Sequence, residues 1–167
     1  LEMTATIKGF EPLYIQRIAQ LTNKSNQFNL TTLRCSEDDI RAMAGDKNDL
    51  CLCGKLVDKF GDNGIVTVVA GRQQGDVLDL TLWLMSCRVL KRGMEDAMMD
   101  TVVAEAAARG VKTIVGHYYP TAKNAMVREF YAQYDFAKTA EDADGNTEWT
   151  LDIAAYTPKH PHMKIER

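Results

Sequence analysis

The chain has 167 residues, a length that suits one compact domain whose core needs no disulfide or metal to fold. Hydrophobic residues make up 46% of the chain and charged residues 26%, a balance that excludes a disordered chain. The net charge of −3 argues against general nucleic-acid binding, and no apolar run is long enough to cross a bilayer. We therefore expect neither nucleic acid nor a membrane as a partner.

The cysteines indicate reduced thiols in a cytoplasmic protein. They are Cys35, Cys51, Cys53 and Cys87, and they lack the paired C-x-x-C spacing of a zinc site, so no metal is expected. The opening Leu-Glu-Met is unusual for a natural N-terminus, which favours one domain cut from a longer protein. We treat residues 1–167 as that single domain, with residues 1–3 as a cloning remnant and residues 157–167 as a polar tail that frays.

Two helices are predicted near the start of the chain. Glu11–Leu21 has apolar residues at helical spacing, and its proline lies in the first turn, where proline is tolerated. Ser36–Gly45 has a serine at the N-cap, acidic residues in the first turn and a glycine at its end. The polar stretch Asn23–Thr32 between them is typical of a loop.

Three strands are predicted next. Leu50–Phe60 and Ile65–Arg72 are β-like runs on either side of Gly61–Gly64, whose composition is typical of a hairpin turn. Val77–Cys87 alternates leucine with other residues, as a strand with one buried face does. We expect these three strands to be antiparallel.

The second half of the chain alternates helices with strands. Helices are predicted at Gly93–Gly110, which is rich in alanine and methionine, and at Asn124–Phe136. Strands are predicted at Val111–Tyr119 and Glu148–Tyr156. Strands before and after crossover helices predict an α/β fold of the α+β kind, in which a mixed, mostly antiparallel sheet is flanked by helices.

The segment Ser86–Met98, where a strand gives way to a helix, carries a functional signal. Arg88, Lys91 and Arg92 place positive charge before a helix start, whose free N–H groups attract anions. Gly93 allows the backbone to approach a phosphate closely. The same residues also suit a plain strand–helix connection with a solvated basic face, and the sequence leaves both interpretations open.

The order of a strand, a basic glycine-containing loop, a long helix, a strand and a helix with Phe130-Tyr131 resembles the GNAT acyltransferases, over roughly residues 57–153. The stretches RIAQLTNKSNQFNLTT, DKFGDNGIV, LMSCRVLKRGME and YPTAKNAMVREFY resemble, more specifically, the C-terminal domain of FkbH-like proteins. In that family, an N-terminal HAD-like (haloacid-dehalogenase-like) domain handles a phosphorylated three-carbon acid. The resemblance implies a role in loading a glyceryl unit onto an acyl carrier protein for polyketide biosynthesis, with the HAD-like domain as a partner absent from this chain.

The GNAT resemblance implies that a pantetheine arm, from the carrier protein or from coenzyme A, enters between Leu84–Arg88 and Thr113–His117. Backbone N–H groups there would polarise the thioester carbonyl. No tightly bound cofactor is implied. Leu90 and Glu95 depart from the GNAT loop pattern, which disfavours the pyrophosphate of coenzyme A and favours the single phosphodiester of a carrier arm. The residues expected to contact the arm are Met85, Cys87, Val89, Leu90, Arg92, Gly93, Met94 and Asn124, and Asn124 also suits an N-cap.

Three side chains are candidates for the chemistry. Tyr131 lies where a GNAT tyrosine protonates the leaving thiolate, and it equally suits packing of its ring on the sheet. Cys87 adjoins Arg88, whose charge favours a thiolate that holds an acyl group as a thioester, although buried free cysteines are commoner. His117 is a candidate base, for Cys87 or for a GNAT reaction, or else a structural histidine.

The sequence thus leaves three functions open. The first is acyl transfer involving a group held on the pantetheine thiol of an acyl carrier protein. The second is a catalytically silent module that binds the carrier for the HAD-like phosphatase domain, which Leu90 and Glu95 favour. The third is a coenzyme A-dependent N-acetyltransferase acting on an amine.

Overall fold

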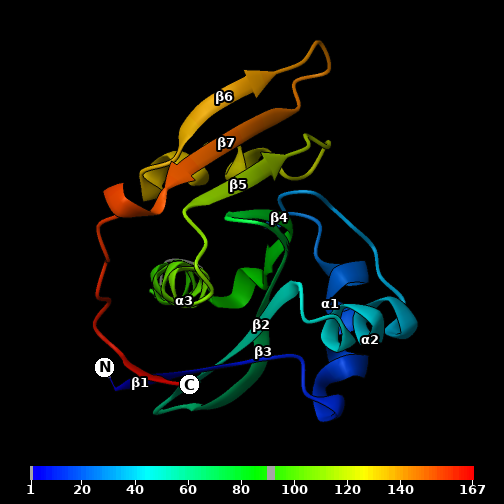
Figure 1. Cartoon of the computed structure of the whole chain (residues 1–167). Helices are drawn as coiled ribbons and strands as arrows, with labels where there is room; N and C mark the ends of the chain where they lie inside the picture. The colour runs from blue at the N-terminus through cyan, green and yellow to red at the C-terminus, as the bar shows by residue number, and fades with distance from the viewer. Residues whose placement is uncertain (1, 90–92) are drawn as a thin grey trace.

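The computed structural model describes residues 2–89 and 93–167, which contain an eight-stranded mixed sheet. The strands are β1 (Met3–Lys8), β2 (Asp49–Asp58), β3 (Gly61–Gln74), β4 (Val77–Met85), β5 (Thr113–Tyr118), β6 (Ala137–Glu141), β7 (Thr147–Asp152) and β8 (Lys164–Glu166). They lie side by side in the order β6-β7-β5-β4-β3-β2-β1-β8 (Figure 1). Neighbouring strands are antiparallel except for the pairs β4–β5 and β1–β8, which are parallel.

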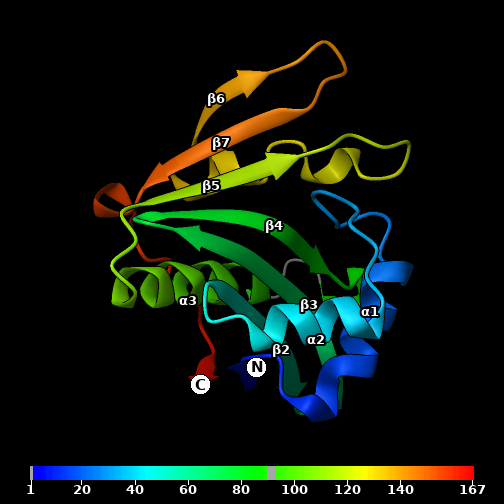
Figure 2. The same ribbon diagram turned by 45° about the vertical axis from the view of Figure 1, so that its right-hand side comes forward.

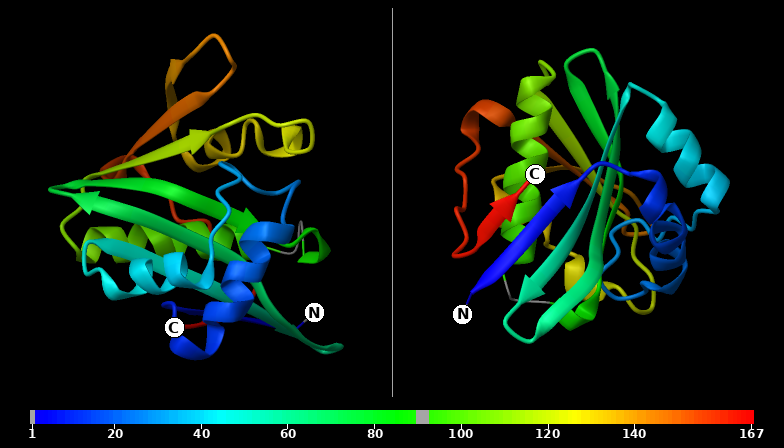
Figure 3. Two further views of the ribbon diagram at one scale, coloured as in Figure 1. Left: turned by 90° about the vertical axis from the view of Figure 1, so that its right-hand side faces the viewer. Right: turned by 90° about the horizontal axis from the view of Figure 1, so that it is seen from below.

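Helices cover both faces of the sheet. In the described residues these are α1 (Ile15–Lys24), α2 (Glu37–Gly45) and α3 (Met94–Ala108). The right panel of Figure 3 shows α3 on one face, with α1 and α2 on the other. Each face has its own apolar core because side chains alternate along β4: Trp83 packs on the α3 side, and its neighbours Leu82 and Leu84 pack on the α1–α2 side. No helix among residues 2–89 and 93–167 is long and apolar enough to cross a membrane.

The first two predicted helices are confirmed. A short 3-10 helix, η1 (Pro12–Tyr14), precedes α1, which continues past the predicted end to Lys24. Ser36 caps α2 as predicted: its Oγ accepts the N–H of Asp39 at 3.1 Å, and the Asp39 carboxylate accepts the N–H of Ser36 at 2.9 Å. Here the local sequence is sufficient to determine where the helix begins.

The antiparallel arrangement of β2, β3 and β4 is confirmed, but the hairpin turn lies earlier than predicted. Asp58 pairs with Gly61, so Lys59 and Phe60 form the turn and the glycine-containing stretch belongs to β3. Gly61 and Gly64 have φ angles of +135° and +70°, which glycine adopts without strain. The β2–β3 ladder shifts register twice in this region, and at each shift β3 has one residue more than β2, so β3 bulges beside Gly64.

The predicted helix at Asn124–Phe136 is wrong. The segment forms two short 3-10 helices, η3 (Ala125–Val127) and η4 (Tyr131–Tyr134). Phe130 and Tyr131 are both buried, and their ring centroids lie 5.2 Å apart in the core below α3. Burial of these bulky rings against the sheet outweighs the helical pattern of the sequence. Two predicted strands are also shorter than expected: η2 (Cys87–Val89) follows β4, and η5 (Ile153–Ala155) follows β7.

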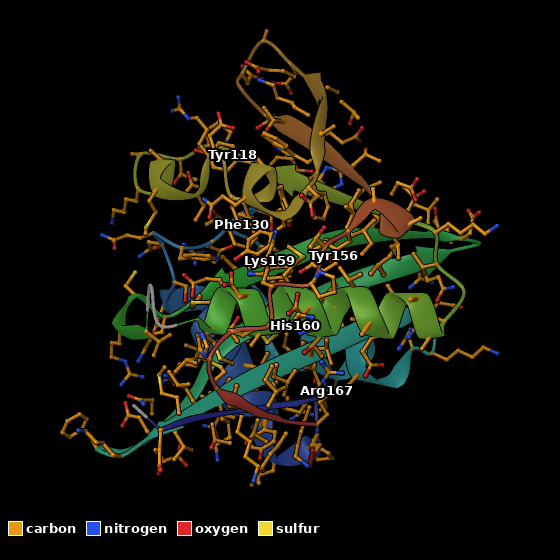
Figure 4. The ribbon with its side chains drawn as sticks, turned by 90° about the vertical axis from the view of Figure 1, so that its left-hand side faces the viewer. Tyr118, Phe130, Tyr156, Lys159, His160 and Arg167 are labelled. Carbon is orange, nitrogen blue, oxygen red and sulfur yellow. The ribbon has the colours of Figure 1, made fainter. Side chains whose placement is uncertain are left out.

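The polar tail does not fray. Its residues 164–166 form β8, which pairs with β1 in parallel. Asp100, on α3, accepts the backbone N–H groups of Lys159 and His160, each at 2.9 Å. Figure 4 shows the tail crossing α3, with Lys159 and His160 beside the helix. Strands β1, β6 and β8 are absent from the sequence prediction. β6 and β8 are short and show little period-two burial, whereas β1 buries alternate residues, Ala5 and Ile7, and was missed.

Candidate functional site

Strands β4 and β5 diverge from a short region of pairing. Val77–Asp79 pairs with Thr113–Val115, and beyond it the two strands separate (Figure 2). Thr81 has no partner in β3, and this bulge bends β4. Residues 28–31, from the loop between α1 and α2, lie between the diverging ends, and we call them the splay segment.

The splay segment is hydrogen-bonded to both strands, in the manner of an extra strand. The Phe28 carbonyl accepts the N–H of Met85 at 3.0 Å, and the Leu30 N–H donates to the Trp83 carbonyl at 3.0 Å. On the other side, the Leu30 carbonyl accepts the N–H of Tyr119 at 2.9 Å, just after β5. The N–H of Met85, which lies in the range expected to bind a pantetheine arm, is therefore bonded to the chain itself.

Asn124 holds the splay segment against the loop that follows β5. Its buried amide nitrogen donates to the carbonyls of Asn29, at 3.0 Å, and Tyr119, at 2.9 Å. Its carbonyl oxygen accepts the N–H of Thr121 at 2.8 Å and the hydroxyl of Tyr118 at 3.2 Å. All four hydrogen-bonding positions of the side chain are thus used. The predicted N-cap is wrong, since the side chain makes no cap bond, and contact with an arm stays a prediction.

Tyr131 lies on the α3 side of the sheet, against β5. A Cβ atom added at Gly116 would be 2.5 Å from its ring, so only a glycine there leaves room for the tyrosine. The ring also packs on Phe136, with centroids 4.8 Å apart. Burial, and secondarily the charge of Asp79, raise the pKa of the Tyr131 phenol, which keeps it protonated. Packing of the ring on the sheet is confirmed, while proton donation to a thiolate stays a prediction.

His117 lies on the opposite face of β5, away from Tyr131. Its Nε2 is 2.5 Å from Oδ1 of Asp79, which lies at the start of β4. Cys87 lies eight residues beyond Asp79, past the end of β4 and in η2, where its Sγ donates to Gln27. His117 and Cys87 therefore have different hydrogen-bond partners, and a role for His117 as the base for that thiol stays a prediction. Its role as a base for another substrate stays a prediction.

A pocket of about 790 Å³ opens where β4 ends, between α1, the splay segment and η2. Among the described residues that line it there is no acidic one, and four are cations: Arg17 and Lys24 from α1, Arg88 from η2 and Lys123 from the loop after β5. We call this the basic pocket. Exposed Cys87 also lines it, and its Sγ donates to Oε1 of Gln27 at 3.1 Å.

The charges of the basic pocket have no acidic partners within the described ranges 2–89 and 93–167, where none of its four cations forms an ion pair. Arg17 bonds to the neutral side chain of Gln20 at 2.8 Å. Arg88 bonds to the hydroxyl of Ser86 at 3.3 Å and to the carbonyl of Asn63 at 3.4 Å. The pocket is therefore strongly positive in a protein of net negative charge.

The polar tail passes beside the start of α3. Gly93, its N-cap, has a φ of +89°, and a Cβ placed there would be 3.1 Å from Met163 and 3.4 Å from Pro161. Of the other residues expected to contact an arm, Met85, Val89 and Met94 have buried side chains. Leu90, Lys91 and Arg92 lie outside the described residues.

Sequence reasoning missed three of the four cations of the basic pocket. Arg17 and Lys24 are seven residues apart on α1, so they share one face of the helix. That spacing is visible in the sequence, but the proximity of this face to the end of β4 and to Lys123 is not. Across the described residues, no three His, Cys, Asp or Glu side chains gather as metal ligands would.

No protein-family model and no curated protein sequence matches the chain. Solved structures do. The ribosomal-protein-S18-alanine N-acetyltransferase from Escherichia coli is 16% identical, with a TM-score of 0.67 over 89% of this chain and 94% of that one. The GNAT domain of S. lividans PAT is 15% identical, with a TM-score of 0.66 over 87% and 89%.

Spermidine N-acetyltransferase from Vibrio cholerae, solved with CoA and spermine, is 9% identical, with a TM-score of 0.66 over 90% of this chain and 96% of that one. Identities this low establish the fold alone. The chain has the GNAT fold, as the order of its elements predicts, with a mixed, mostly antiparallel sheet flanked by helices.

Proposed function

We propose that the domain is the acyltransferase part of an FkbH-like protein, and that it moves a glyceryl-type acyl group between Cys87 and the pantetheine thiol of an acyl carrier protein. The observation that carries this proposal is the exposed Cys87 thiol inside the basic pocket. The other cysteines are buried or half-buried. The GNAT fold is compatible with acyl transfer. The resemblance of the sequence stretches to FkbH-like proteins is the basis for proposing a glyceryl group, an acyl carrier protein and a HAD-like partner domain.

The reaction is an exchange of thioesters. The Cys87 thiolate attacks the carbonyl carbon of the carrier-bound thioester, a new C–S bond forms and the bond to the pantetheine sulfur breaks. Pantetheine leaves as a thiolate and takes up a proton, which balances the proton that Cys87 loses to water at this exposed position. Gln27, whose side-chain oxygen accepts the thiol hydrogen, orients the sulfur before reaction.

The splay segment fills the space between the diverging ends of β4 and β5, and we call this arrangement the closed splay. It supports acyl transfer through Cys87 rather than acyl transfer between these two strands. The N–H of Met85, which would polarise a thioester carbonyl between the strands, is bonded to Phe28. Tyr131 is buried among aromatic rings on the far side of the splay segment. A thioester bound in the basic pocket can react with Cys87 while the splay segment and Tyr131 stay in place.

The catalytically silent carrier-binding module is the second candidate. It is favoured by the same closed splay, together with Asn124, whose hydrogen bonds fasten the segment in place. In this case the basic pocket docks the carrier while the HAD-like domain carries out all the chemistry, and Cys87 stays unmodified.

The coenzyme A-dependent N-acetyltransferase is the third candidate, and it is favoured by His117 and its carboxylate partner Asp79 beside the splay. A histidine held by a carboxylate suits deprotonation of an amine acceptor. Spermidine N-acetyltransferase, one of the structural neighbours, was solved with CoA and spermine. Turnover of acetyl-coenzyme A with spermine, lost in His117→Ala, would favour this candidate.

Intact-protein mass spectrometry after incubation with glyceryl-loaded acyl carrier protein tests the proposal. We expect the domain to gain one glyceryl group, and Cys87→Ala to gain none. Cys51→Ala, which removes a half-buried thiol of β2, is the matched control and should be acylated like the parent. A domain that binds the carrier but never gains the group would favour the silent module instead.

A further inference from the structure

We infer that the basic pocket is a phosphate-ester site that holds the phosphodiester of the carrier's pantetheine arm outside the splay. This inference rests on the proposed function and names how the same site recognises its partner. Sequence reasoning placed the phosphate at the start of α3, on the loop around Gly93. The geometry points instead to Arg17, Lys24, Arg88 and Lys123.

The first argument is convergence. The four cations come from three segments that are distant in sequence, namely α1, the end of β4 with η2, and the loop after β5. Arg17 and Lys24 lie seven residues apart, about two helical turns, so both project from the same face of α1 toward the end of β4. Four cations from three separate segments would not be expected to gather around one pocket if surface charges were distributed at random.

The second argument is charge balance. The chain carries three more acidic than basic residues, yet the described residues that line this pocket include no Asp or Glu. Like charges held around one cavity repel one another, and a bound anion relieves that repulsion. A phosphate oxygen bonded to a guanidinium or an ammonium is a charge-assisted hydrogen bond, roughly twice as strong as a neutral one.

The third argument is access. The pocket's volume of about 790 Å³ lies within the range of small-molecule sites, and it opens directly beside the exposed thiol of Cys87. At the competing phosphate site, the start of α3, Met163 and Pro161 lie beside the α-carbon of Gly93. The described residues therefore offer an anion four cations at the basic pocket, while apolar carbon adjoins the N-cap of α3.

Titration calorimetry with free phosphopantetheine tests the inference, using Cys87→Ala protein so that binding is separated from acyl transfer. We expect phosphopantetheine to bind, and pantetheine without its phosphate to bind at least tenfold more weakly. Lys24→Gln and Lys123→Gln should each weaken phosphopantetheine binding about tenfold, and raised salt should weaken it further. Lys112→Gln is the matched control, since exposed Lys112 precedes β5 at the opposite end of the parallel β4–β5 pair.

The result that overturns the inference is equal binding of phosphopantetheine and pantetheine, or affinity that Lys24→Gln and Lys123→Gln leave unchanged. A phosphorylated three-carbon acid distinguishes the source of the phosphate: tighter binding of that acid than of phosphopantetheine would overturn the carrier-arm assignment. Failure of the proposed function has a different signature. In that case phosphopantetheine binds with the expected charge dependence, but loaded carrier never acylates Cys87.

Discussion

Replacement of Asn124 by alanine should release the splay segment from the sheet. The wild-type side chain donates to two carbonyls and accepts from two donors. One of these partners, the Asn29 carbonyl, lies 95 positions away from Asn124 in the sequence. Two of its four partners, the Asn29 carbonyl and the Tyr118 hydroxyl, are deeply buried and cannot turn to water. The other two, at Tyr119 and Thr121, lie in exposed residues where water can replace the amide.

The magnitude follows from the two buried partners. Each buried polar group left without its hydrogen bond costs roughly 1–3 kcal/mol, whereas the two exposed groups cost little. We therefore expect Asn124→Ala to lower the free energy of unfolding by about 2–6 kcal/mol, the sum for the two buried partners. Loss of the tie should also speed hydrogen exchange at the Leu30 and Met85 amides, which bond the splay segment to β4.

Urea unfolding measures the stability change, and hydrogen exchange resolved by residue measures the release. Asn146→Ala is the matched control, because its amide bonds only to exposed Asp142, at 2.9 Å, and its loss should cost less than about 0.5 kcal/mol. If Asn124→Ala is as stable as this control, or if the Leu30 amide keeps its protection, then Asn124 does not hold the splay segment.

Two further predictions concern the packing and titration of the sheet. Gly116→Ala should lower the free energy of unfolding by about 1–3 kcal/mol, because its Cβ would overlap the buried ring of Tyr131, whereas Gly45→Ala, with open space around it, should be neutral or slightly stabilising. Equal urea midpoints for the two variants would contradict this packing. Burial raises the pKa of Cys51 and Cys53 from an ordinary value of 9.0 to about 12. The native state therefore holds these protons more tightly than the unfolded state, so the contribution of the two thiols to stability is fully present below pH 9 and is lost between pH 9 and 12. A flat profile over that range, in urea unfolding at stepped pH, would show that the thiols are accessible.

Local sequence was enough for elements whose ends are marked by side-chain chemistry. Ser36 and its capping box begin α2, and the leucine alternation of β4 predicted a strand there. The single buried face that this alternation predicted is wrong, because the bulge at Thr81 places Leu78 and Leu80 on the α3 side and Leu82 and Leu84 on the α1–α2 side. The order of helices and strands then predicted a mixed sheet, and the structure has it. These features depend on contacts within a few residues, so the pattern of the sequence contains them.

Local sequence failed where long-range packing outweighed propensity. The stretch after Asn124 has helical spacing but forms 3-10 turns, because Phe130 and Tyr131 are buried against the sheet. The β2–β3 turn lies before Gly61, earlier in the chain than predicted, for a related reason. Pairing along the whole β2–β3 ladder sets the register and therefore the position of the turn.

The sequence by itself determined which chemical groups the protein carries: a thiol at Cys87, a basic stretch beside it and the order of elements that makes the GNAT fold. Only the tertiary structure decided how those groups meet. It paired His117 with Asp79, exposed the thiol of Cys87, closed the splay with residues 28–31 and gathered Arg17, Lys24 and Lys123 around the thiol. The physical reason is distance along the chain. Backbone propensity and side-chain periodicity act over a few residues, whereas each of these contacts joins segments that only sheet pairing and core burial bring together.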